Sequence, residues 1–275
     1  MTPQAVTAEP LLQVRGLCKT YSDRRWWQAQ FLLTALDNVY LAIQTGRTLA
    51  LVGESGSGKT TLAMCLVGLE QADSGEIWFE GKNLLAQSGR NRAAVGREIQ
   101  LVFQDSTGAL SPRMSAAQII EEPLLIHRQG KRKERSELVL EMMAKVGLSP
   151  KWKDRWANQF SGGQRQRLAI ARALVLNPKL LILDEALAGL DLSIQGQIVN
   201  LLLDLQESEA LSYLFISHNL ELAGQVADEI AVMYQGQVVE RASPTQIFMH
   251  PRHPHTQTLL AAVPPRLAYS AQSGG

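Results

Sequence analysis

With 275 residues, the chain is long enough for one large α/β domain, or for a core domain with a smaller lobe. Its 27 Lys and Arg residues against 26 Asp and Glu residues give a net charge of +1, so bulk charge indicates neither a nucleic-acid binder nor a membrane-surface binder. The sequence shows no signal peptide and no apolar run of the roughly 18 residues that a membrane span needs, so we expect a soluble, intracellular protein. Cys18 and Cys65 lack the spacing of a metal site, and we expect both thiols to be reduced.

Short β-leaning segments open the chain. Residues 11–14 and 36–43 are broken by turn residues, and residues 75–81 resemble a strand bounded by glycines, so we expect an antiparallel lobe. Residues 22–33 are basic and aromatic, and the sequence favours a surface loop over an RNA-binding patch there. Tyr21 precedes this loop and could stack on a nucleobase or simply pack at the strand end.

A glycine-rich loop gives the strongest signal. The segment Gly53–Thr61 fits G-x-x-x-x-G-K-[ST] between an apolar strand at 48–52 and a helix expected to end at Gly68. Glycines let consecutive backbone N–H groups point at phosphate oxygens. We expect Lys59 to reach the β- and γ-phosphates of a nucleotide and Thr60 to coordinate Mg²⁺. The expected phosphate-binding residues are Gly53, Glu54, Ser55, Gly56, Ser57, Gly58, Lys59, Thr60 and Thr61.

A second core strand is predicted at 98–103, with Gln104 at its carboxyl end. Such an end faces the ligand crevice of a parallel sheet, so Gln104 could meet Mg²⁺ or the attacking water, or be only a solvated loop residue. From about residue 105 to residue 160 the pattern becomes helical, which predicts a helical insertion into the core. The mixed-charge run at 131–135 favours a solvated face over a nucleic-acid patch.

Ser161-Gly162-Gly163-Gln164 precedes a helix predicted at 165–176. Ser161 and Gln164 have the spacing of a capping box. A cap does not explain two adjacent glycines, which weaken a helix but expose its first backbone N–H groups to an anion. This segment therefore predicts a second phosphate contact.

Two carboxylates follow a continuous apolar run at 180–183, which is typical of a central parallel strand. Buried carboxylates are costly without a cation, so Asp184 suits Mg²⁺ and Glu185 suits a general base that activates water. A last core strand is predicted at 213–217, and it presents His218 either to the γ-phosphate or as a cap or core residue.

Taken in order, these motifs resemble the nucleotide-binding subunit of ATP-binding-cassette (ABC) transporters over about residues 11–265. The Ser-Gly-Gly-Gln sequence separates this family from other P-loop proteins. The resemblance places Tyr21 at the adenine-stacking position, Gln104 at the Q-loop and Asp191 at a turn that touches the opposite subunit. Two subunits of such proteins clasp two ATP molecules head to tail. Ser161, Gly162 and Gly163 would then serve the γ-phosphate in the partner's site, and Gln164 and Asp191 are also expected to be nucleotide-binding residues.

The resemblance implies an α/β fold: a P-loop NTPase (RecA-like) core with an antiparallel β subdomain and an inserted α-helical subdomain. We expect the nucleotide-binding domain at 11–241, with the helical subdomain at about 105–165, and a C-terminal extension at 242–265. Residues 1–10 and 266–275 are expected to be flexible.

A narrower resemblance is to the peptide- and nickel-importer ATPases. It rests on a longer loop after Tyr21 and on short motifs at residues 103–105, 112–114, 122–124 and 253–256. The chain has His255 where tyrosine is usual, and Ala186 where proline commonly follows the glutamate. Some members hold a cysteine-bound cluster near the tail, where this chain has no cysteine.

These resemblances imply an ATPase that uses ATP and Mg²⁺ to drive uptake of peptides or of nickel or metal-chelate-like solutes. It would lie peripherally on the cytoplasmic face of the inner membrane. Its partners would be two permease subunits, a second, non-identical ABC ATPase and, indirectly, an extracytoplasmic solute-binding protein, with no nucleic acid.

The alternative is a soluble ABC-type ATPase acting on ribosomes or DNA, but such proteins ordinarily show a second cassette or a long coiled coil. A kinase or GTPase is disfavoured because the chain lacks an N-K-x-D motif.

Overall fold

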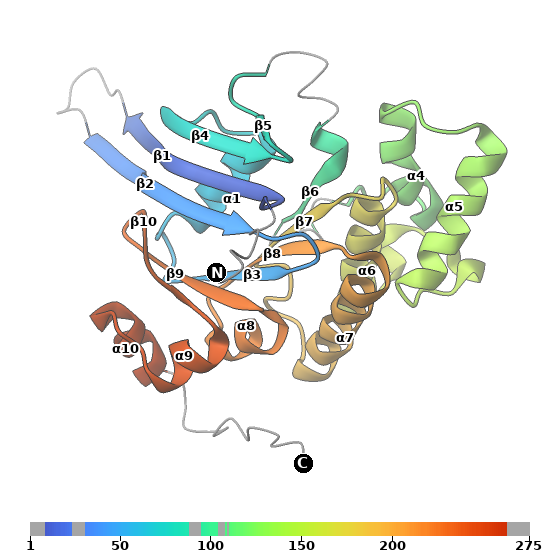
Figure 1. Ribbon diagram of the computed structural model, residues 1–275. Helices are drawn as coiled ribbons and strands as arrows, with labels where there is room; N and C mark the ends of the chain where they lie inside the picture. The colour runs from blue at the N-terminus through green and yellow to red at the C-terminus, as the bar shows by residue number, and fades with distance from the viewer. Residues whose placement is uncertain (1–8, 24–30, 88–94, 104–107, 109, 263–275) are drawn as a thin grey trace, which may run out of the picture.

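The computed structural model describes residues 9–23, 31–87, 95–103, 108 and 110–262. In this part of the chain, a six-stranded sheet, a four-stranded sheet and a group of helices pack together (Figure 1). The architecture confirms the predicted α/β fold with an antiparallel lobe and inserted helices.

The six-stranded sheet has the order β10-β9-β3-β8-β7-β6, and all its neighbouring pairs are parallel except β9 with β10. Every residue of β3, β7 and β8 is buried, which explains their continuous apolar runs. Its strands are β3 (Thr48–Val52), β6 (Ile99–Val102), β7 (Leu180–Asp184), β8 (Ser212–Ser217), β9 (Glu229–Tyr234) and β10 (Gln237–Ala242). The predicted last core strand at 213–217 is therefore followed by two further strands.

The antiparallel sheet has the order β2-β1-β4-β5 and lies above the larger sheet in Figure 1. Its strands are β1 (Leu12–Asp23), β2 (Phe31–Ile43), β4 (Ser74–Phe79) and β5 (Lys82–Asn83). β1 and β2 are much longer than predicted, because register shifts let the pairing continue past the turn residues Gly16 and Asn38. Residues 22–23 and 31–33 of the predicted surface loop therefore belong to β1 and β2, and residues 24–30 lie outside the described residues.

The helices lie on both sides of the larger sheet and beyond its edge (Figure 1). Helix α1 begins at Lys59 and ends before Gly68, as predicted, with Gly68 in the left-handed conformation at φ 76°. Helix α6 begins three residues earlier than predicted, because Gly162 and Gly163 form its first turn. The helices include α1 (Lys59–Val67), α4 (Ala116–Ile126), α5 (Arg132–Lys145), η1 (Pro150–Trp152), η2 (Ala157–Gln159), α6 (Gly162–Leu174), α7 (Leu192–Glu209), α8 (Leu220–Val226), α9 (Pro244–Met249) and α10 (Pro254–Ala261).

Three groups of buried apolar side chains hold these layers together. One joins α1 to both sheets, through residues such as Leu12, Leu49 and Leu62. Another joins the inserted helices α4 and α5 to α6, α7 and one face of the sheet. The third packs α8 and α9 on the β9 side, including Ile247. None of the helices in the described ranges has both the length and the apolar character needed to cross a membrane.

Candidate nucleotide site

The loop between β3 and α1 holds its lysine in place. The Lys59 ammonium group donates hydrogen bonds to the carbonyl oxygens of Gly53 (2.9 Å) and Glu54 (2.7 Å) and lies 3.4 Å from Ser57 Oγ. Lys59 is only 5% exposed. Burial lowers the pKa of Lys59, although the carboxylates of Glu185 and Asp184 act in the opposite direction. The loop therefore holds a buried ammonium group beside two acids.

The last glycine of this loop, Gly58, is required because the backbone of β2 passes close to it. Gly58 has φ 108°, and a Cβ atom added there would lie 2.2 Å from the carbonyl oxygen of Ala35. Any larger residue would push β2 away from the start of α1. This contact couples the antiparallel sheet to the loop, so the position of β2 depends on the glycine.

Asp184 ends β7 and is 2% exposed, and its Oδ1 atom has no hydrogen-bond partner in the described residues. Burial raises the pKa of Asp184 and the charge of Glu185 adds to the rise, whereas a hydrogen bond from Thr60 and the charge of Lys59 oppose it. A buried carboxylate oxygen without a partner, next to a threonine hydroxyl, is an oxygen donor set of the kind Mg²⁺ prefers. The residues present therefore fit this ion.

Glu185 and His218 lie together at the ends of β7 and β8. His218 Nδ1 is 3.3 Å from Glu185 Oε2, and the Glu185 side chain is 16% exposed against 61% for His218. Glu185 has φ 47°, a left-handed backbone conformation that is uncommon outside glycine. Its backbone N–H donates to the carbonyl oxygen of Ile216, which anchors this turn to β8.

Lys59, Glu185 and His218 line one cleft of about 320 Å³ between the phosphate loop and the end of the antiparallel sheet, whereas Asp184 does not line it. Tyr21 and Leu33, which are cross-strand partners, form its apolar wall. The lining residues are Tyr21, Leu33, Ala35, Ser55, Gly56, Gly58, Lys59, Thr60, Thr61, Glu185 and His218. The sequence analysis did not predict Leu33 and Ala35 as site residues. Alternate residues of a strand face the same side, so the pairing of β2 with the strand that carries Tyr21 could have indicated both. Gln104 lies outside the described residues.

The Ser-Gly-Gly-Gln segment does not line this cleft. Ser161 caps α6 as predicted: its Oγ accepts a hydrogen bond from Gln164 N, and Gln164 Oε1 accepts one from Ser161 N. A Cβ atom added at Gly163 would lie 2.5 Å from Ile194 Cγ2, so α6 packs tightly on the first turn of α7. Asp191 stands at the N-cap position of α7, where its side chain makes no capping hydrogen bond. The segment therefore packs beside the start of α7, and neither the segment nor Asp191 lines the cleft.

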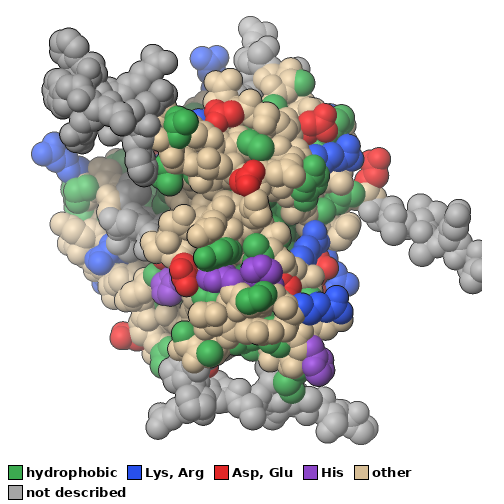
Figure 2. All heavy atoms as spheres, turned by 90° about the vertical axis from the view of Figure 1, so that its left-hand side faces the viewer, with side chains coloured by type: hydrophobic (Ala, Val, Ile, Leu, Met, Phe, Trp, Pro, Cys, Tyr) green, Lys and Arg blue, Asp and Glu red, His purple; other side chains and the backbone are tan. Residues whose placement is uncertain are grey.

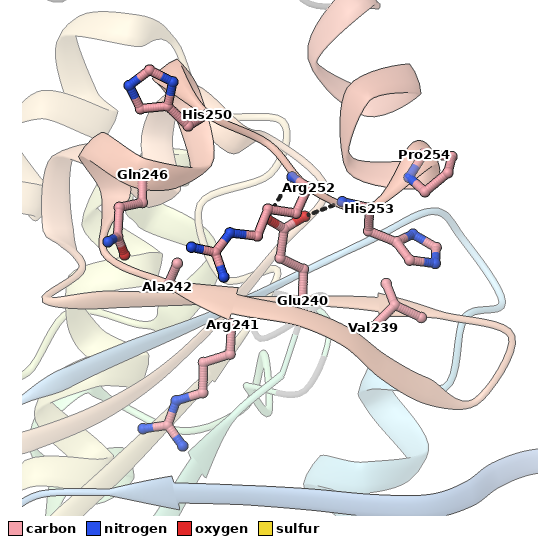
Figure 3. Close-up of a pocket in the computed structure, with 9 residues that line it drawn as sticks. All are labelled: Val239, Glu240, Arg241, Ala242, Gln246, His250, Arg252, His253 and Pro254. Atoms are coloured by element: carbon pink, nitrogen blue, oxygen red, sulfur yellow. Dashed lines mark hydrogen bonds between the residues drawn. The ribbon is translucent and has the colours of Figure 1, made fainter.

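A larger cavity of about 720 Å³ lies between β10 and the tail helices. Figure 2 shows histidine side chains gathered on the face where β10 and α10 lie. In Figure 3 the side chains of Arg241, His250 and Arg252 point in different directions, so the cationic groups do not converge on one point. No group of three His, Cys, Asp or Glu residues in the described part of the chain is placed to hold a metal ion. The cleft beside Lys59 is therefore the better candidate site.

The fold and the cleft define a P-loop nucleotide-binding protein. A family model described as "ABC transporter" matches residues 36–188. The chain is 46% identical over 264 residues to the dipeptide transport ATP-binding protein DppF of Escherichia coli (strain K12), covering 96% of this chain and 79% of that protein. It is 43% identical over 261 residues to the glutathione import ATP-binding protein GsiA of Salmonella typhimurium, covering 94% of this chain but only 42% of GsiA.

Two solved structures with a similar fold are also ABC proteins. CbiO1 from Clostridium perfringens, described as part of an ABC transporter complex, matches with a TM-score of 0.77 and 28% identity, over 88% of this chain and 91% of that one. The ATP-binding cassette MJ0796 in a dimeric post-hydrolysis state with ADP and Pi matches with a TM-score of 0.75 and 28% identity, over 85% and 98% of the two chains. The chain therefore belongs to the ABC transporter family and is an ATPase cassette of that family.

Proposed function

We propose that the chain is the ATP-hydrolysing subunit of an ABC importer whose cargo is a small peptide. Two relatives that match nearly the whole chain are named for dipeptide transport and glutathione import, and both cargoes are peptides. These names do not favour the alternative of a soluble ATPase acting on ribosomes or DNA. Nickel import belongs to the same subfamily and is the second choice of cargo.

The buried lysine and the loop hold the phosphate chain in this proposal. The ammonium group of Lys59 meets the β- and γ-phosphates, and the backbone N–H groups at the start of α1 add the positive end of the helix dipole. Thr60 and Asp184 hold Mg²⁺, since the unpartnered Oδ1 of Asp184 needs a cation. When bound, this ion neutralises the charge that develops on the phosphate oxygens during hydrolysis.

In this proposal Glu185 is the general base. His218 lies next to Glu185 and contacts the γ-phosphate. The carboxylate of Glu185 is mostly buried and lies 3.3 Å from His218, so its orientation is restricted. It accepts the proton of the attacking water while the phosphates are held by the loop. This placement of Glu185, in the same cleft as Lys59, is the observation that carries the proposed reaction.

The remaining predicted residues take the following parts. Tyr21 and Leu33 provide the apolar wall for the base, and Gln104 senses the γ-phosphate. Because the Ser-Gly-Gly-Gln segment and Asp191 do not line the cleft, we propose that they complete the site of a second ATPase subunit. Each catalytic centre then needs two chains.

We further propose that the cassette at 11–241 binds two permease subunits on the cytoplasmic face of the inner membrane. The inserted helices, at about 105–165, transmit the closing of the ATPase pair to the permeases, and residues 242–265 form an extension. A solute-binding protein outside the membrane selects the cargo. The second ATPase is a related but different chain.

Two substitutions separate chemistry from binding. Glu185→Gln keeps the size of the side chain but removes the base, so phosphate release should fall by about 10²–10⁴-fold while ATP remains bound. Lys59→Ala should weaken ATP binding itself, because it removes the charge that meets the phosphates. Phosphate release and bound ATP are measured on the same purified complex.

Glu141→Gln, an exposed change on α5, serves as the control and should leave both quantities unchanged. Near-normal phosphate release from Glu185→Gln would remove this residue from the catalytic role. ATP binding to Lys59→Ala at the normal affinity would contradict the phosphate site.

A further inference from the structure

A lysine outside the cleft lies against the aromatic side chain that forms its wall. Lys19 Nζ is 5.1 Å from the centre of the Tyr21 ring, within the distance of a cation–π contact. Lys19 does not itself line the cleft, whereas Tyr21 does. The ammonium group therefore covers the ring without occupying the space in which a ligand would bind.

The segment after α1 fixes this ammonium group. Lys19 Nζ donates a 2.8 Å hydrogen bond to the carbonyl oxygen of Gln71, and it lies 3.4 Å from Glu70 Oε2 and 3.8 Å from Asp73 Oδ1. Its side chain is 13% exposed. Although burial opposes the charge, the hydrogen bond to Glu70 and the carboxylate of Asp73 raise the pKa of Lys19. A long side chain that would otherwise sample many rotamers is thus held in one place.

The same segment also fixes the backbone beneath Tyr21. Thr20 N donates a 2.6 Å hydrogen bond to Asp73 Oδ2, and Asp73 N donates to the carbonyl oxygen of Cys18. Tyr21 itself lies near the end of β1, two residues before Asp23. Its opposite wall partner, Leu33, is 53% exposed and leaves apolar surface uncovered. Lys19 thus contacts the Tyr21 ring beside this apolar surface.

We propose that Lys19 is a positioning residue that holds the Tyr21 ring in the orientation in which a nucleobase stacks on its free face. The inference rests on the proposed ATP site. Lys19 touches neither the phosphates nor the reacting atoms. It acts only through the ring, so its contribution concerns the base and not the triphosphate.

The test compares a ligand that has a base with one that lacks it. In the purified full-length chain, Lys19→Met keeps most of the aliphatic stem but removes the charge. We expect ATP to bind about three- to tenfold more weakly, the effect of losing one cation–π contact. Tripolyphosphate, which reaches only the phosphate loop, should bind with unchanged affinity. A purely structural role of Lys19 would weaken both ligands together.

Lys179→Met is the matched control. Lys179 Nζ also bridges carboxylates from separate elements, with 2.7 Å and 2.6 Å contacts to Glu80 and a 3.8 Å contact to Glu98, but among the described residues it makes no cation–π contact. Its loss should leave the affinities of ATP and tripolyphosphate unchanged. Lys19→Arg should restore most of the ATP affinity, because a guanidinium group also stacks on a tyrosine ring.

A double-mutant cycle completes the test. In a Tyr21→Ala background the Lys19→Met change should have no further effect on ATP affinity, because the ring through which it acts is gone. Equal losses for ATP and tripolyphosphate, no loss at all, or an undiminished effect in the Tyr21→Ala background would each overturn the proposal. Failure of the unsubstituted chain to bind ATP would instead overturn the proposed function.

Discussion

The buried side chain of Asp184 favours binding of a cation at the expense of the stability of the folded chain. Burial and the charge of Glu185 raise its pKa, so the folded chain favours the protonated form. The stability that this group contributes is therefore full at low pH and is lost as the pH rises through the raised pKa. Ionising this buried carboxylate has a cost, and a bound cation would offset that cost.

We therefore predict that Asp184→Asn raises the melting temperature of the chain without nucleotide by about 2–4 °C, equivalent to about 1 kcal/mol. The neutral amide removes a buried charge and keeps the size of the side chain. With the ATP–Mg²⁺ complex at about 100 times its dissociation constant, binding should stabilise the unsubstituted chain by about 2.7 kcal/mol, and the part of this that requires Mg²⁺ should be largely lost in Asp184→Asn. Thermal melting with ATP, in the presence of either Mg²⁺ or a chelator, measures both effects.

Asp204→Asn is the control, because Asp204 is exposed on α7 and its loss should change neither melting temperature nor the response to Mg²⁺. An equal Mg²⁺ response in Asp184→Asn and in the unsubstituted chain would exclude Asp184 from the ion site.

At the scale of single elements, Glu240 of β10 holds the tail against the sheet (Figure 3). Its Oε1 accepts a 2.9 Å hydrogen bond from Arg252 N, and its Oε2 accepts a 2.9 Å hydrogen bond from His253 N. These N–H groups lie just before α10, so the carboxylate also faces the positive end of that helix. Although burial opposes it, the Thr256 side chain and then these two backbone N–H groups lower the pKa of Glu240 from its ordinary value of 4.5.

A carboxylate with a lowered pKa stabilises the fold above its unfolded pKa, and that contribution is lost as the pH falls through the lowered value. Glu240→Gln replaces one acceptor oxygen with an N–H₂ group that faces a donor. We expect its melting temperature at pH 7 to fall by about 2–4 °C, or about 1 kcal/mol. The difference from the unsubstituted chain should shrink as the pH is lowered below 4.5. A pH-independent difference would show that the charge of Glu240 does not hold the tail.

The elements that the sequence predicted well are those whose signal is local. The loop from Gly53 to Thr61, the cap formed by Ser161 and Gln164, and the apolar strand before Asp184 are each specified by neighbouring residues. The long β1 and β2 were underestimated because the register shifts near Gly16 break the alternation that identifies a strand. Strand β9 was missed, although its apolar run ending before Gly236 was a usable signal.

Contacts between distant residues could not be predicted from the sequence. The bonds that tie Lys19 to residues 70–73 join segments about fifty positions apart, and no local pattern predicts them. The left-handed backbone of Glu185 likewise depends on its bond to β8. By contrast, Glu185, His218 and Lys59 were brought together correctly because the carboxyl ends of parallel strands share one edge.

At the scale of the whole molecule, the surface that carries Ser161 and Asp191 does not line the chain's own cleft. If these residues complete a site in another ATPase, the active complex holds two cassettes. We predict that the complex isolated from membranes contains this chain once, with a different ATPase chain and two permeases, as measured by mass spectrometry of the intact assembly. Two identical copies of this chain in that assembly would contradict the prediction.

The hydrogen bonds within the phosphate loop have a kinetic consequence. Because Gly53 and Glu54 already hold the Lys59 ammonium group in place, the triphosphate meets a formed binding surface and the loop need not fold around it. Little conformational entropy is then lost when the nucleotide arrives. Nucleotide capture should accordingly be a single-step encounter, with a rate that rises in proportion to ATP concentration.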